Sequence, residues 1–227
     1  MSRLDEMVAA RRLSTTVARM RALARAGSVS RADGLAAEQA SASEHCDICG
    51  APLADEHRHL LHLDDRRIVC ACEPCWALHG GDPEYRPVGT RTVWLEPFDL
   101  DDELWGRFQI PIALAFFMRS SVTGGVVAFY PSPAGATESE LPLQAWEEVA
   151  RRNPILAELE SDAEALIVNR LSDPPQCAIA PIDSCYELVG LIKSRWQGIW
   201  GGAALSETVP EFFSRLRRRA DASGLAR

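Results

Sequence analysis

The chain has 227 residues, 47% hydrophobic and 25% charged, a composition typical of a soluble globular protein with one main domain and a smaller part. Its net charge is −8, from 24 basic and 32 acidic residues, and this excess of acidic residues argues against a nucleic-acid partner. The longest apolar run, 110–118, is too short to span a membrane, and the first residues carry no secretory signal, so we expect a cytoplasmic protein.

Residues 1–44 are predicted to form a helix followed by a flexible linker. Apolar side chains recur at helical spacing between Leu13 and Ala24, and Gly27 is expected to end this helix. The stretch from Ser28 to Glu44 contains almost no large apolar residue, which is typical of a linker. The helix would dock either on a partner or on its own chain.

Cysteines cluster in the next segment, as two Cys-x-x-Cys pairs: Cys46 with Cys49, and Cys72 with Cys75. Two residues between thiolates allow a tight turn whose sulfurs converge on one ion, and Gly50 permits the positive φ that such a turn needs. This spacing indicates a zinc site. We therefore expect the four cysteines to ligate one structural zinc ion in a module of residues 45–90.

The residues between the two pairs predict the fold of this module. His57–Leu63 and Arg67–Cys70 alternate in polarity around a turn, which favours a β-hairpin. Pro74 suits the first turn of a helix that would carry the second pair. The tight turn of the first pair, called a knuckle in zinc proteins, followed by a hairpin and a helix is similar to a treble clef or a zinc ribbon. The metal would supply the stability that so small a core lacks.

Two features of the module leave alternatives open. A rubredoxin-like iron site also uses four thiolates, although Trp76 stands where the second loop of rubredoxins has glycine. Cys70 is a fifth thiol that could replace Cys72 as a ligand.

All five histidines lie between His45 and His79. Of these, His57, His59 and His62 would either decorate the hairpin or form a second metal site.

Residues 91–227 are predicted to form an α/β domain with the order strand, strand, helix twice over. We expect a mixed four-stranded sheet with helices on one face, in a chain of overall α+β class. The expected strands are Ile110–Arg119, Val126–Tyr130, Ala163–Arg170 and Gln176–Ala180. The expected helices are Asp99–Phe108 with Asp99 as its cap, Pro142–Arg152, Tyr186–Trp196 with Asp183 or Ser184 as its cap, and Glu207–Arg219. The Pro-rich residues Pro131–Glu140 are expected to be a loop.

The sequence offers little support for an enzyme. Cys185 lies near the start of a predicted helix, where the helix dipole would lower a thiol pKa. No histidine follows His79, so a catalytic base would have to come from the metal module. No catalytic or cofactor-binding residue is therefore assigned, and a thiol enzyme that uses Cys185 is kept only as an alternative.

Three segments resemble an uncharacterised, mostly actinobacterial family whose genes lie beside those of uptake-type nickel-iron hydrogenases. They are "CDICGAPLADEHRHLLHLDDRRIVCACEPC", "FFMRSS…VVAFYPSPAGATES" and "PIDSCYELVGLIKSRW", and the likeness runs from about Cys46 to Arg218. The resemblance implies an accessory role in hydrogenase assembly, stability or electron delivery. We therefore expect a non-enzymatic accessory protein that binds a hydrogenase subunit or maturation factor, with a rubredoxin-like electron carrier as the first alternative.

Overall fold

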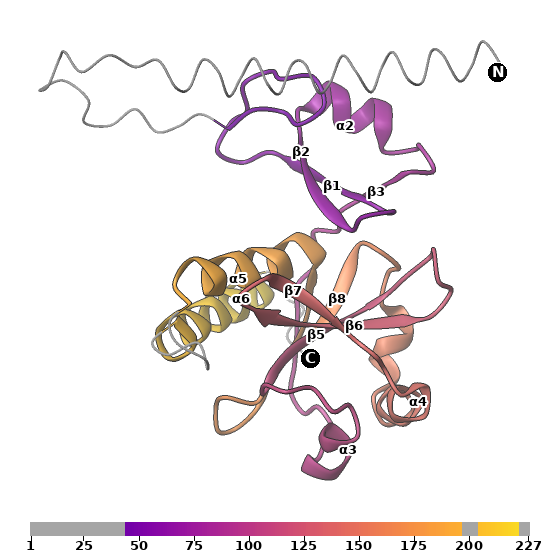
Figure 1. Ribbon diagram of the computed structural model, residues 1–227, viewed down its shortest axis with the longest axis vertical. Coiled ribbons are helices and arrows are strands. Elements are labelled where there is room, and N and C mark those ends of the chain that lie inside the picture. Colours follow the sequence, from indigo (N-terminus) through magenta and orange to yellow (C-terminus); the bar gives the residue numbers. More distant parts are fainter. Residues whose placement is uncertain (1–43, 197–203, 223–227) are drawn as a thin grey trace, which may run out of the picture. The chain divides into compact units, whose positions relative to one another are not determined.

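The computed structural model describes residues 44–196 and 204–222 (Figure 1). The helix predicted near Leu13 and nearly all of the linker predicted after it lie outside the described residues. The strands are β1 Arg58–His62, β2 Arg67–Ala71, β3 Tyr85–Pro87, β4 Val93–Leu95, β5 Leu114–Arg119, β6 Val126–Ser132, β7 Gly135–Ser139, β8 Glu164–Asn169 and β9 Gln176–Pro181. The helices are α2 Glu73–His79, α3 Asp102–Gly106, α4 Leu143–Arg152, α5 Ile182–Ser194 and α6 Val209–Ala222, with a 3-10 helix η1 Pro154–Glu158 and a π-helix η2 Ala204–Thr208.

The main sheet has six strands in the order β4-β9-β8-β5-β6-β7. Every neighbouring pair in it is antiparallel, so the predicted mixed four-stranded sheet is wrong in both strand count and direction. The four strands predicted in this domain all form, as β5, β6, β8 and β9. β5 pairs with β6 and β8 with β9, and β5 pairs with β8 at the centre of the sheet. The two strands that the sequence did not predict, β4 and β7, are its edges.

Both faces of this sheet are covered by helices, whereas the sequence predicted helices on one face. Successive side chains of a strand point to opposite faces, so in β5 Phe116 belongs to the core beneath α5 and α6, and Phe117 to the core beneath α4. Figure 1 shows α5 and α6 on one side of the sheet and α4 on the other. The apolar runs of β5 and β8 are continuous because the two faces of each strand are buried.

The caps predicted for two helices are wrong. Asp101, rather than Asp99, caps α3, because its Oδ1 accepts the N–H of Leu104 at 2.7 Å. Helix α5 begins at Ile182, directly after β9, so neither Asp183 nor Ser184 is its cap. The side chain of Asp183 is therefore available to contact the small sheet.

The small sheet has the order β2-β1-β3, with the predicted hairpin of β1 and β2 confirmed. Adjacent residues of β1 serve two cores: Leu60 is buried among the cysteines of the module, and Leu61 is buried in the core beneath α5 and α6. The hairpin thus packs on the rest of the protein through one face.

The predicted domain boundaries at residues 44 and 90 stay predictions. No described helix has both the length and the apolar character needed to cross a membrane.

Candidate metal centre

The first cysteine pair lies in a tight turn just before β1. The carbonyl of Cys46 accepts the N–H of Gly50 at 2.8 Å, and the N–H of Cys46 donates to the carbonyl of Ala51 at 2.8 Å. Gly50 has φ +77°, in the left-handed region that glycine adopts without strain, as the sequence predicted. These contacts close the turn so that Cys46 and Cys49 lie on the same side of it.

The second pair lies at the start of α2. Cys72 is the N-cap residue, Pro74 lies in the first turn as predicted, and Cys75 follows within the helix. The carbonyl of Cys72 accepts the N–H of Trp76 at 2.8 Å, which begins the helical hydrogen bonding. One helical turn therefore presents both sulfurs toward the first pair.

The four sulfurs converge. The Sγ atoms of the two pairs all lie within 4.8 Å of one another, and those of Cys49 and Cys72 are 3.6 Å apart. Thiolates about 2.3 Å from a tetrahedral zinc ion would be roughly 3.8 Å apart, so this spacing suits one ion. The cluster could hold a metal, and the arrangement by itself does not select zinc over iron because both ions accept tetrahedral sulfur.

Electrostatics at the cluster favour one thiolate. Burial acts to raise the pKa of Cys46, but backbone N–H groups of Cys72 and Cys49 direct their dipoles at its sulfur and lower the pKa to about 6. Burial and the adjacent sulfurs raise the pKa of Cys75 to about 12. Four thiolates at this distance repel one another, so a bound cation is what would allow all four to ionise together.

The cluster has a buried side and an exposed side. Cys46 and Cys75 are buried with Leu60 and Val69 in the small core, whereas Cys49 is exposed. An ion could therefore enter from solvent and would be bound at the edge of an apolar shell.

Cys70 does not join this cluster. It lies in β2, which ends at Ala71, whereas Cys72 lies beyond the strand as the helix cap, so the two thiols do not share one strand. The sulfur of Cys70 lies within 4.8 Å of ring nitrogens of His57 and His59 instead. Burial raises the pKa of Cys70, and the negative charges of Asp47 and Glu44 add to this effect.

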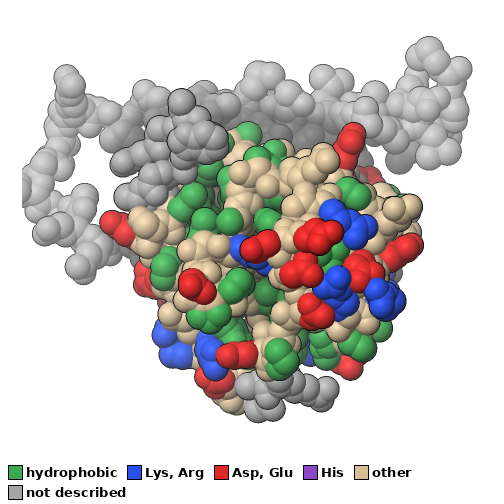
Figure 2. Space-filling view, turned by 90° about the horizontal axis from the view of Figure 1, so that it is seen from below, with side chains coloured by type: hydrophobic (Ala, Val, Ile, Leu, Met, Phe, Trp, Pro, Cys, Tyr) green, Lys and Arg blue, Asp and Glu red, His purple; other side chains and the backbone are tan. Residues whose placement is uncertain are grey.

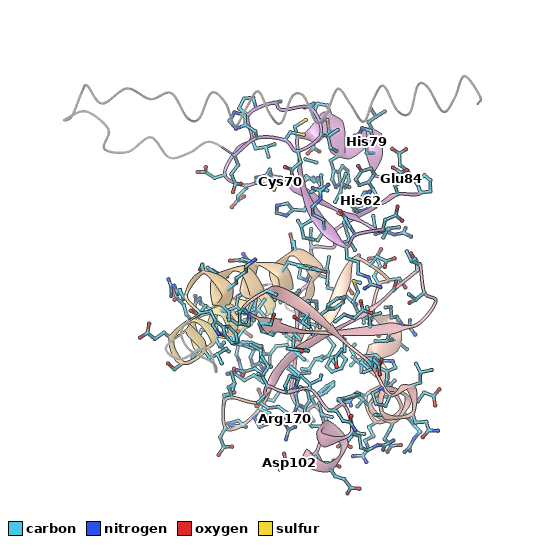
Figure 3. All side chains as sticks on the ribbon, viewed as in Figure 1. His62, Cys70, His79, Glu84, Asp102 and Arg170 are labelled. Atoms are coloured by element: carbon cyan, nitrogen blue, oxygen red, sulfur yellow. The ribbon has the colours of Figure 1, made fainter. Side chains whose placement is uncertain are left out.

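The other hairpin histidine lies apart from these residues. His62 contacts Asp65 through Nδ1 at 2.7 Å and stacks edge-on against Tyr85. His79 contacts the same tyrosine ring, and Figure 3 shows His62 and His79 on the side of the module away from Cys70. The three histidines singled out in the sequence therefore divide between two places, as expected for a strand in which successive side chains point to opposite faces.

Cys185 lies far from solvent. Its side chain is completely buried in the core beneath α5 and α6, and this burial raises its pKa. A raised pKa and an inaccessible sulfur give no support to a nucleophilic role.

The face of the main domain in Figure 2 carries acidic and basic side chains next to one another. In the main domain Arg152 pairs with Asp99, Asp101 and Glu148, and Arg170 pairs with Asp102. This face therefore offers no concentrated positive patch for a phosphate backbone.

A pocket of about 420 Å³ lies between β4, the residues after β8 and α6, with Arg170 and Arg217 in its wall.

The fold and the cysteine cluster define an α+β protein with antiparallel sheets and a four-thiol site able to hold a metal ion. The chain belongs to the family of unknown function DUF5947, whose model matches residues 45–220. Comparisons with curated proteins and with solved structures gave no match.

Proposed function

We propose that the protein is a non-enzymatic accessory factor in which Cys46, Cys49, Cys72 and Cys75 bind a structural zinc ion, and that it acts by binding a hydrogenase subunit or maturation factor. The observation that supports the metal site is the convergence of four sulfurs from two chain segments within 4.8 Å. Four thiolates complete the coordination of zinc and leave no position for a catalytic water, which favours a structural ion over a catalytic one.

The local fold favours zinc over a rubredoxin-like iron site. The first pair lies in a knuckle with Gly50, but the second lies at the start of α2, with Trp76 after Cys75. A knuckle, a hairpin and a helix that carries the second pair are similar to the treble clef of structural zinc proteins. A rubredoxin-like site would instead use two knuckles.

Metal analysis of substituted proteins tests the ligand set. Cys49→Ser and Cys75→Ser are each expected to lose the ion of the four-thiol site, because three thiolates and a hydroxyl bind zinc far more weakly than four thiolates. Cys177→Ala is the matched control, since Cys177 is buried in the main sheet away from the cluster.

Elemental analysis with quantitative thiol titration gives the readout. If Cys49→Ser and Cys75→Ser keep the metal content of the wild type, the ligand assignment is wrong.

The same preparations decide between zinc and iron. Protein expressed in its native host is expected to be colourless and to contain zinc. The electron-carrier alternative predicts a red protein with thiolate-to-iron charge-transfer absorption that bleaches on reduction. Iron in the four-thiol site of native protein would replace the structural-zinc proposal with that alternative.

The partner part of the proposal is supported by the resemblance to the hydrogenase-linked family and has its own experiment. A tagged full-length chain, expressed in the native host under hydrogenase-inducing conditions, is expected to recover a hydrogenase subunit or maturation factor. The Cys75→Ser protein serves as the comparison, because it tests whether an intact module is needed. Recovery of hydrogenase components at background level by the wild-type chain would contradict the proposed partner.

A further inference from the structure

A second group of metal-binding side chains lies beside the four-thiol cluster and shares no residue with it. His57 directly precedes β1 and His59 is the second residue of that strand, and their rings lie together, with centroids 4.8 Å apart. The strand register places Cys70 of β2 directly opposite His59. Two imidazoles and one thiol from neighbouring strands are thus brought together, with one donor atom of each within 4.8 Å of the others.

Hydrogen bonds fix the orientation of both imidazoles. Nδ1 of His57 lies 3.0 Å from the carbonyl oxygen of Ala54, and Nδ1 of His59 lies 2.7 Å from Oδ2 of Asp183. A carbonyl and a carboxylate can only accept, so the protons of both neutral rings lie on Nδ1 and their lone pairs on Nε2. An imidazole that donates through one nitrogen to an oxygen and is free at the other is the arrangement found in metal-binding histidines.

The two free nitrogens face each other. Nε2 of His57 and Nε2 of His59 are 3.2 Å apart, and two lone pairs at that distance repel unless a cation lies between them. Nitrogens about 2.0–2.1 Å from a tetrahedral zinc ion would be roughly 3.4 Å apart, so the observed spacing suits ligation. A proton shared between the two nitrogens is the competing explanation of their short distance.

A carboxylate lies near these ring nitrogens and could serve as a further ligand. Oε2 of Glu44 lies 3.6 Å from Nε2 of His57. The side chain of His57 is only 8% exposed, whereas that of Glu44 is 66% exposed and can exchange with water. A pocket of about 390 Å³ lined by His57, His59 and Asp183 opens beside the group and gives an ion a route from solvent.

We propose that His57 Nε2, His59 Nε2 and Cys70 Sγ bind a second divalent metal ion, of the zinc or cobalt type, whose fourth position is taken by the Glu44 carboxylate or by water. Mixed imidazole and thiolate ligands select borderline-soft ions of this kind over magnesium or calcium. Unlike the four-thiol site, this one retains an exchangeable position. The Asp183 contact makes α5 of the main domain part of the second coordination layer.

The test measures stoichiometry on the full-length chain. Native mass spectrometry after saturation with Zn²⁺ is expected to give two zinc ions per wild-type chain and one ion in His59→Ala and in Cys70→Ala. His62→Ala is the matched control, since its ring bonds Asp65 outside the group, and it should retain two ions. One ion in saturated wild-type protein, or two ions in both His59→Ala and Cys70→Ala, would overturn the proposal in favour of the shared proton.

A second measurement separates this proposal from the four-thiol site. His59→Ala is expected to keep the first ion, whereas added Zn²⁺ should no longer protect its Cys70 from alkylation as it does in the wild-type chain. Zinc-dependent protection of Cys70 that persists in His59→Ala would contradict the proposed ligand set. Retention of the wild-type number of ions by Cys49→Ser would contradict only the proposed structural site.

Discussion

Glu164 places a carboxylate in the interior of the main domain, with 3% of its side chain exposed. Arg91 binds it with two hydrogen bonds, from Nε at 2.9 Å and from Nη2 at 2.7 Å. The N–H of Glu160 donates to the same carboxylate at 3.3 Å. A charge buried this deeply is tolerated only because its oxygens are paired. The Arg91 guanidinium therefore helps to hold the segment that leaves the small sheet against the main sheet, together with the hydrogen bond from the N–H of Gly89 to the carbonyl of Ala163.

Arg91→Ala is expected to lower the free energy of unfolding by about 3 kcal/mol, because it leaves the Glu164 carboxylate buried without its counter-charge. Urea denaturation followed by circular dichroism measures this loss. Arg151→Ala removes an arginine whose side chain is 71% exposed and which pairs with Glu148, and it should cost less than about 1 kcal/mol. Equal losses in the two variants would show that the buried pair has no special role.

The grouping of site residues could be predicted from the sequence where it depends on spacing within a short segment. The two Cys-x-x-Cys pairs lie within single turns, so their convergence follows from short segments and needed only a hairpin between them. The partnership of Cys70 with His57 and His59 depends on the register between β1 and β2. A change of register by one residue would turn Cys70 to the other face, and residue types alone do not specify that register.

Among the elements, α4 shows how one side chain ends a helix and holds a second segment. Nδ2 of Asn153 donates to the carbonyls of Val149, at 3.0 Å, and of Asp99, at 2.9 Å. Its Oδ1 accepts the N–H of Asp99 at 2.8 Å. The sequence predicted the end of the helix from Asn153-Pro154. The hydrogen bonds from the Asn153 side chain to Asp99, before α3, could be recognised only in the tertiary structure.

Asn153→Ala is expected to lower the free energy of unfolding by about 2 kcal/mol, because it removes the side-chain partners of both the N–H and the carbonyl of Asp99. Chemical denaturation gives the value, and amide exchange at Asp99 should rise in the same variant. Ser194→Ala, which removes an exposed hydroxyl bonded only within its own helix, should change stability by less than about 0.5 kcal/mol. An unchanged amide exchange rate at Asp99 would show that the Asn153 side chain does not stabilise this segment.

The elements that the sequence missed are the sheet edges. β7, Gly135–Ser139, consists of small and polar residues between prolines, and it forms a strand because β6 continues through Pro131 to Ser132 and pairs with it. β4 has only three residues, too few for a period of two to be read. Strands with two buried faces carry long apolar runs and were found, whereas edge strands take their structure from the neighbour they pair with.

At the scale of the whole molecule, the small sheet and the main domain depend on different sources of stability. The main sheet is covered on both faces by helices, whereas the buried part of the module consists of little more than Leu60, Val69 and Ala71 with two of the cysteines. A core of this size does not offset the entropy of ordering its chain without a further contribution. The metal ion that we propose supplies it.

Metal removal is expected to loosen the module and leave the main sheet intact. Chelation at neutral pH should raise amide exchange in the knuckle after Cys46 and in α2 by at least tenfold, because their hydrogen bonds depend on the bound ion. Exchange in β5 and β8 should stay unchanged. Hydrogen exchange with mass spectrometry measures both regions in one sample. Increased exchange of equal size in β8 would show that the two parts unfold as one unit.

None of the four clustered cysteines lies in an element from β4 onward, and those elements include most of the helical and strand residues. Far-ultraviolet circular dichroism and gel filtration would therefore report a well-folded sample whether or not the proposed ions had been lost during purification. Two batches of identical appearance could differ completely in composition at the sulfur cluster. Every functional assay on this protein accordingly requires an elemental measurement of the batch that was used.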